Sequence, residues 1–199
     1  MQNSLASEIT QKYTNNQPLE TLLNTLEKSL STNPDAHATR DSLEVACLYA
    51  IRIKDIVKFK FYWQILQPYY DIHSLPVSQR MNLIVALNLL SLIANNNLAE
   101  FHLELELVKD RDNIYIKHPI QLEQCLMEGS YSKILNSRSN VPAQEYLFFV
   151  DILFNTIRAE IANSCEKAYL SLPLADAASL LYFKSPEELS VFIKEVCFN

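Results

Sequence analysis

The chain has 199 residues, and 49 % of them are hydrophobic, which is enough to bury the core of one domain, or of one large domain with a small appended one. The net charge is −6 with both signs interspersed, so neither nucleic acid nor a membrane surface is an expected partner. One residue is glycine where average usage would give roughly fourteen, and this excludes glycine-rich phosphate loops and nucleophile elbows. We therefore expect a mainly helical, non-enzymatic chain whose function lies in its surface.

The first third of the sequence predicts three short helices. Residues 5–13 form a short first helix, and a leucine stripe over residues 19–30 marks a second. The pair Asn33-Pro34 is typical of a helix start, and a third apolar stripe follows over residues 43–53. Repeated helices of this kind indicate a helical array that resembles tetratricopeptide repeats without a strict sequence period.

The middle of the chain continues the helical pattern. Asp55 is expected to cap a fourth helix that ends at Pro68, and Pro76 or the next residue begins a fifth, nearly all-apolar helix. Three consecutive asparagines at 95–97 break the chain after it. Residues 98–108 then show helical spacing, although leucine and glutamate alternate over part of the stretch as in a strand. We favour a helix because the three-to-four spacing begins earlier.

The next segment predicts a linker and two helices joined by a tight turn. Residues 109–117 form a charged linker, and Pro119 begins a helix that ends at Gly129. Glycine is expected there because the position after a helix end often needs the left-handed conformation. Ser130 then caps a short helix, which residues 137–140 follow as a loop.

The last sixty residues predict a different organisation. Pro142 begins a long helix that carries apolar side chains on two sides and must be covered on both. Residues 172–174 are extended, residues 175–182 form a small helix, and Ser185-Pro186 begins another. Two short helices around a tight turn suggest a helix-turn-helix. The inner stripe of the long helix contains Tyr146, Phe149, Val150, Leu153, Ile157 and Ile161.

No sequence motif indicates catalysis, metal binding or cofactor binding. The four histidines lack helical partners, and no paired-cysteine motif is present, so no metal or cofactor is expected. The four cysteines are far apart and unpatterned, and the first residues lack signal-peptide regions, as in a cytoplasmic and nuclear protein. The most apolar stretch, residues 81–93, is too short to span a membrane.

Two features suggest nucleic-acid binding and are better explained otherwise. The aromatic residues of 59–63 alternate with lysine, but helical spacing places most of them in the core. Residues 164–199 carry three lysines against five acidic residues, and a recognition helix beginning Pro-Glu-Glu would direct acids at phosphates. We interpret the helix-turn-helix as a protein-docking element.

A resemblance to a known family is carried by the segment 115–131, which contains YIKHP, LEQ and LMEGSY. It closely resembles the PCI-domain subunits of the 26S proteasome lid. Segments 87–106 and 148–169 are similar to the same family, so the resemblance covers the chain from Leu83 to its end. PCI subunits of the signalosome and of eukaryotic initiation factor three match the 115–131 block less well and remain the alternative.

The resemblance implies a non-catalytic scaffold in lid assembly and ubiquitin-dependent protein degradation. It implies N-terminal helical repeats over residues 1–140, and a long linking helix with a winged-helix module over residues 141–199. The sequence stops at Asn199, so we expect the wing strands and the C-terminal helix of this module to lie outside it. Expected partners are other PCI-domain lid subunits, with a proteasomal ubiquitin receptor as a further candidate.

A candidate partner surface lies around the most diagnostic block. It mixes aromatic, basic and acidic groups, a composition favoured at interfaces. The alternative is that two of its members, Tyr115 and His118, pack the linker onto the array. The surface consists of Tyr115, Lys117, His118, Glu123, Glu128 and Tyr131.

Overall fold

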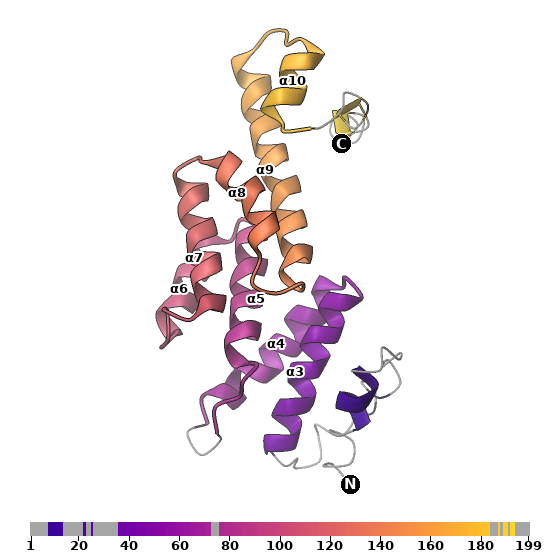
Figure 1. Ribbon diagram of the computed structural model, residues 1–199, viewed down its shortest axis with the longest axis vertical. Helices are drawn as coiled ribbons and strands as arrows, with labels where there is room; N and C mark the ends of the chain where they lie inside the picture. The colour runs from indigo at the N-terminus through magenta and orange to yellow at the C-terminus, as the bar shows by residue number, and fades with distance from the viewer. Residues whose placement is uncertain are drawn as a thin grey trace.

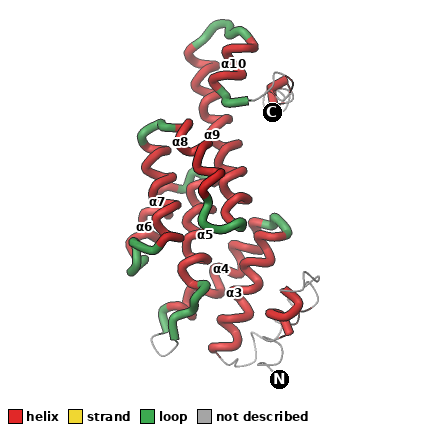
Figure 2. Tube along the Cα trace, viewed as in Figure 1, coloured by secondary structure: helices red, strands yellow, loops and turns green. Residues whose placement is uncertain are grey.

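The computed structural model describes residues 8–13, 36–72 and 76–183, together with 22, 25, 187, 189–190 and 192–193. The described chain is mainly helical, as the sequence predicted, and contains no strand (Figure 2). The predicted starts at Asn33-Pro34 and Ser185-Pro186, and nearly all of the helix at 19–30, lie outside the described residues. The helices are α3 (Ala36–Arg52), α4 (Ile56–Tyr70), α5 (Met81–Ala94), α6 (Leu98–Leu107), α7 (Ile114–Met127), α8 (Tyr131–Ser137), the 3-10 turn η1 (Arg138–Asn140), α9 (Tyr146–Ala168) and α10 (Leu174–Leu180).

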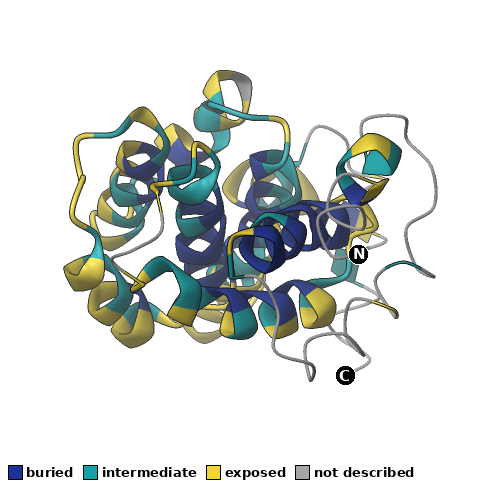
Figure 3. Ribbon diagram, turned by 90° about the horizontal axis from the view of Figure 1, so that it is seen from below, coloured by how far each residue is buried: buried dark blue, intermediate teal, exposed yellow. Residues whose placement is uncertain are grey.

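The helices form an elongated array with α3 and α4 at one end and α10 at the other (Figure 1). α5 lies at its centre and packs against α6, α7 and α9. Seen along the array, the buried residues face its interior and the exposed ones its outside (Figure 3), and α3 and α5 contain the largest shares of buried residues. The nearly all-apolar sequence of α5 therefore has the role predicted for it, because it is covered on several sides at once.

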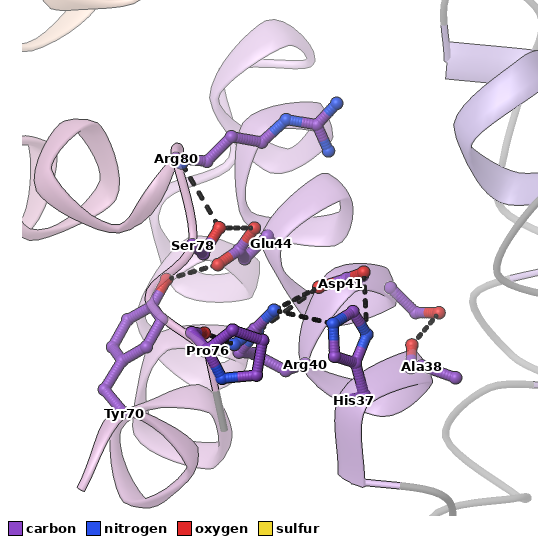
Figure 4. Close-up of polar contacts among 10 residues, drawn as sticks. His37, Ala38, Arg40, Asp41, Glu44, Tyr70, Pro76, Ser78 and Arg80 are labelled. Carbon is purple, nitrogen blue, oxygen red and sulfur yellow. Dashed lines mark hydrogen bonds and ion pairs between the residues drawn. The ribbon is translucent and has the colours of Figure 1, made fainter. Parts of the chain in front are cut away.

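The α3–α4 pair is held by local and tertiary polar contacts. The Asp55 side chain accepts a hydrogen bond from the backbone N–H of Lys58 at 3.0 Å, which confirms the predicted cap of α4. Glu44 on α3 is 2 % exposed and accepts hydrogen bonds from Tyr70 at 3.1 Å and Ser78 at 2.8 Å (Figure 4). Burial raises the pKa of the Glu44 carboxyl.

The same contacts explain two wrong predictions about helix ends. Pro68 does not end α4, which continues to Tyr70, where the hydroxyl bonds to Glu44. α5 begins at Met81 and not at Pro76. The Pro76 carbonyl accepts a hydrogen bond from the buried Arg40 (Figure 4), which holds that stretch of chain against α3 in a non-helical path.

Pro119 also lies inside a helix and does not begin one. α7 starts five residues earlier at Ile114, where the Asn113 side chain accepts a hydrogen bond from the Tyr115 N–H at 3.1 Å. The predicted charged linker is therefore shorter than expected. Proline has no N–H to donate to the carbonyl four residues before it, which is that of Tyr115. The hydroxyl of Tyr146 on α9 donates to this carbonyl instead, at 3.1 Å, and offsets the loss.

Gly129 has the left-handed conformation that the sequence predicted, with a φ of 67°. Its N–H bonds to the Leu126 carbonyl at 3.0 Å, and the next N–H, of Ser130, bonds to the Cys125 carbonyl at 2.9 Å. These two bonds form a Schellman motif that closes α7. Ser130 then occupies the N-cap of α8 without a capping side-chain bond, and a 3-10 turn replaces the loop expected after α8.

The long helix α9 begins at Tyr146, four residues later than Pro142, because residues 142–145 form a turn. Its buried side chains are Tyr146, Phe149, Val150, Leu153, Phe154 and Ile157, so the predicted inner stripe is confirmed except for Ile161, which is half-buried. The Thr156 hydroxyl donates to the Ala94 carbonyl at 2.8 Å and so closes the end of α5.

Beyond Ile157 the character of α9 changes. None of its last eleven residues is buried, and this half projects from the core toward α10 (Figure 1). Residues 171–173 have no regular structure, and α10 begins directly after the extended Pro173. The helical-array and winged-helix details implied by the family resemblance stay predictions.

Candidate protein-interaction surfaces

The described part of the chain is better suited to protein interaction than to catalysis or metal binding. No three histidine, cysteine, aspartate or glutamate side chains gather there in a way that could hold a metal ion. None of the helices described is long and apolar enough to cross a bilayer. Cys47 is buried, and burial raises the pKa of its thiol, while Cys125 and Cys165 are half-buried and free.

The six residues predicted as one exposed partner surface differ in their exposure. His118 is buried at 8 % exposure, so its assignment to an exposed face is wrong. Tyr115 and Tyr131 are half-buried and pack against the core. Lys117 and Glu128 are the members that are exposed. The helical period of α7 separates the set, because positions three and four apart share a face and adjacent positions do not.

His118 belongs to the packing of α7 on α9. Its ring meets the Tyr146 ring edge-on, with centroids 5.4 Å apart and an angle of 82°. Neither of its ring nitrogens has a hydrogen-bond partner in the described structure. Burial lowers the pKa of His118, so the neutral imidazole is favoured. This contact supports the alternative reading, in which His118 and Tyr115 join the segment to the array.

The charged members of the predicted surface have close partners. Glu123 lies 3.4 Å from His102 and links α7 to α6, and Lys117 lies 3.2 Å from Asp112. Glu128 lies 3.6 Å from Lys133 across the Gly129 turn. The Lys117–Asp112 and Glu128–Lys133 pairs are exposed and contribute at most about 1 kcal/mol each, so their groups are open to exchange for a partner's charges.

The projecting end of the array presents large apolar side chains that sequence reasoning missed. We define the tip surface as Tyr169, Leu170, Leu174, Leu180 and Tyr182, which are between 40 % and 109 % exposed. A signal for it existed, since the apolar stripe of α9 stops at Ile161 while the helix continues. Several large exposed apolar side chains within fourteen consecutive residues are a feature typical of an interaction site.

Arg158 fixes the chain that follows α10. Its guanidinium donates to the carbonyl of Leu181 at 3.2 Å and to that of Tyr182 at 3.4 Å. It also lies over the Phe183 ring at 4.3 Å from the centroid. Tyr182 has a φ of 56°, an uncommon conformation for an aromatic residue, and these bonds hold it. The turn that ends the tip surface is thus held by α9.

A groove lies along the second apolar side of α9. It has a volume of about 520 Å³, and its walls come from α9, the end of α3 and the described N-terminal helical segment. Tyr13 lies at one edge, where its ring contacts the Arg52 guanidinium at 5.3 Å. Phe148 and Ile152, predicted to need cover, line this groove and are half-buried, so their cover is incomplete.

These features define a mainly helical class of protein with two surface grooves and a set of exposed apolar side chains at one end. The family model that matches is the CSN8/PSMD8/EIF3K family, over residues 79–198. The chain is 37 % identical over 188 residues to 26S proteasome non-ATPase regulatory subunit 8 homolog A of Arabidopsis thaliana, covering 92 % of this chain and 68 % of the relative. It therefore belongs to the CSN8/PSMD8/EIF3K family.

Two further relatives have similar names. The chain is 36 % identical over 186 residues to 26S proteasome non-ATPase regulatory subunit 8 of Caenorhabditis elegans, covering 89 % of this chain and 74 % of the relative. It is 36 % identical over 171 residues to the 26S proteasome regulatory subunit RPN12 of Saccharomyces cerevisiae, with 81 % and 62 % covered. The chain thus spans between about three fifths and three quarters of these relatives.

Proposed function

We propose that this chain is a non-catalytic scaffold subunit of the 26S proteasome regulatory-particle lid and acts through protein–protein interfaces in lid assembly and ubiquitin-dependent degradation. The observation that carries the proposal is the similarity to proteasome regulatory subunits over most of the chain. The family also includes signalosome and initiation-factor members, but the relatives compared above are proteasome subunits, which disfavours that alternative.

The tip surface supports a docking role. Its apolar side chains lie directly after α9, on the seven-residue helix α10, which has no buried residue, and directly after α10. Burying a large apolar side chain contributes about 1.5–3 kcal/mol, so a partner that covers several of them gains binding free energy. We propose that other PCI-domain lid subunits cover this surface, with a proteasomal ubiquitin receptor as a further partner, in the cytoplasm and the nucleus.

The proposal is tested by purifying the tagged full chain from cells and identifying the complexes that come with it. We expect lid subunits in constant ratio together with proteasomal peptidase activity. Recovery of the chain with signalosome or initiation-factor subunits, or alone, would contradict the proposal.

Matched variants assign the interface. Leu170→Glu combined with Leu174→Glu is expected to reduce lid recovery at least fivefold. Val77→Glu, which also places a carboxylate at a highly exposed apolar position but lies far along the chain from the tip, is the control. Charge reversal of Lys117 and Glu123 tests the predicted surface on α7 in the same assay. Unchanged lid recovery would contradict a role for that surface in assembly.

A further inference from the structure

A second groove lies between α4, α5 and α6 and has no role in the proposed function. Its volume is about 510 Å³, a size at which pockets enclose a drug-sized ligand. α4 and α6 form the two walls, and α5 contributes Asn88 and Leu92 to the floor. A groove of this size accommodates a segment of a few residues, and not a whole domain.

The floor contains a buried polar group without a partner. Asn88 is 5 % exposed, and no other group in the described part of the chain hydrogen-bonds to its side-chain amide. Trp63, 7 % exposed, lines the same groove, and no partner within the described residues bonds to its indole N–H either. Neither side chain is among the fully enclosed polar groups without a partner, so their donors and acceptor face the groove and are free to pair with a ligand that enters it.

The chemistry of the floor identifies the conformation of that ligand. A carboxamide offers one acceptor and two donors, the complement of a peptide group. A helical ligand uses its own N–H and C=O groups internally, whereas an extended chain leaves them available. Two more carboxamides, Gln64 and Gln67, stand on the α4 wall. Amides in this arrangement are better suited to hydrogen-bond with the main chain of a ligand than with any particular side chain.

The walls identify the charge of the ligand. α6 contributes Glu100 and Glu104, while α4 contributes a single lysine, Lys60. Gln67 donates to Glu104 at 3.4 Å, and burial raises the pKa of Glu104, so its anion lacks a compensating charge. Glu100 accepts a hydrogen bond from Asn97 at 3.0 Å. A cation facing the α6 wall would stabilise both carboxylates.

We propose that the groove between α4, α5 and α6 binds an extended segment of a partner protein whose main chain pairs with the Asn88 amide and whose basic side chain faces Glu100 and Glu104. Leu92 and Leu103, which is 64 % exposed, receive an adjacent apolar side chain. The proposal goes beyond the proposed function, because it concerns the groove whether or not the chain assembles into a lid.

The probe is a phage-displayed library of random twelve-residue peptides, selected on the immobilised full chain. Selected peptides are synthesised, labelled and measured by fluorescence anisotropy. We expect sequences that contain lysine or arginine next to an aliphatic residue, and binding that weakens as salt rises. A library that yields no binder, or one that yields acidic peptides, would overturn the proposal.

Two variants test the groove itself. Asn88→Leu is expected to weaken binding at least tenfold while leaving the melting temperature unchanged or higher, because it removes an unpaired buried amide. Glu100→Gln with Glu104→Gln should weaken binding about threefold or more and flatten its salt dependence. These two carboxylates lie nearer the surface, so this variant decides the question if Asn88→Leu fails to fold.

The matched control is Asn155→Leu, the same change at the groove beside α9. It is expected to leave peptide affinity unchanged. Equal affinity in Asn88→Leu and the unaltered chain, or an equal loss in Asn155→Leu, would show that the peptides bind elsewhere.

Discussion

α5 and α10 are both apolar helices, but one is buried in the core and the other is exposed. Ten of the 14 residues of α5 are buried, whereas α10 has no buried residue. The difference comes from their neighbours, since α5 packs against α6, α7 and α9, while α10 lies at the end of the array (Figure 1). α5 therefore contributes to stability, as does α3, in which 13 of 17 residues are buried, and the exposed apolar side chains of the tip surface are available for binding.

The largest expected effect separates the two regions directly. Leu87 on α5 is fully buried, and Leu87→Ala should lower the free energy of unfolding by about 2–5 kcal/mol. Leu174→Ala, at 60 % exposure on α10, should change it by less than about 0.5 kcal/mol. Urea denaturation of both variants measures the difference, and equal losses would contradict the division into core and tip.

Substitution of Gly129 tests the left-handed turn between α7 and α8, which depends on backbone conformation alone. A side chain there would meet no atom within 4 Å, so the cost of Gly129→Val is conformational. We expect about 1–3 kcal/mol of destabilisation from holding a β-branched residue at positive φ. Gly129→Asn should cost less, because asparagine tolerates this region better. A melting temperature unchanged in the valine variant would show that the turn can re-form without glycine.

A double-mutant cycle between Tyr146 and Pro119 tests whether the tyrosine hydroxyl replaces the helix hydrogen bond that proline cannot make. Tyr146→Phe leaves the Tyr115 carbonyl without its donor and should cost about 1–2 kcal/mol. Pro119→Ala restores an N–H that can reach the same carbonyl, so Tyr146→Phe should cost less in that background. An identical cost in both backgrounds would mean that the hydroxyl does not substitute for the missing helix bond.

The smallest expected effect is a pH dependence from His118. Burial lowers its folded pKa below the ordinary value of 6.5, so the unfolded chain binds more protons as the pH falls. The stability is therefore fully present above about pH 6.5 and is lost on acidification. His118→Phe keeps a ring against Tyr146 and removes the titration.

The melting temperature should fall more between about pH 7.5 and 5.5 in the unaltered chain than in this variant. Glu44 and Glu104, whose pKa values burial raises, act in the opposite direction in both proteins and cancel in the comparison. Parallel curves for the two proteins would remove His118 as the cause.

Much of the core could be read from the sequence, and the errors share one cause. The burial of α5, the Asp55 cap and the Gly129 turn follow from local patterns. Pro68, Pro76, Pro119 and Pro142 were interpreted as helix boundaries, and the structure puts two of them inside helices and two in the chain before one. Tertiary contacts decide these cases, as when Tyr146 supplies the hydrogen bond that Pro119 cannot.

The candidate surfaces were harder to predict because they are built from distant segments. Asn88 reads as one polar residue on an apolar helix, and its groove appears only when α4 and α6 close around it. His118 reads as part of a mixed polar surface, and its burial depends on a tyrosine 28 positions later. Periodicity gives the face of one helix but not the identity of its neighbours.

Hydrogen exchange of the free chain and of the same chain in purified proteasomes tests the central claim most directly. In the free chain we expect slow exchange over α5 and fast exchange over residues 158–182, because few apolar contacts cover that region. In the assembly, residues 158–182 should gain protection while α5 stays as it was. Residues 158–182 that exchange equally fast in both states would contradict the claim that the tip is the docking surface.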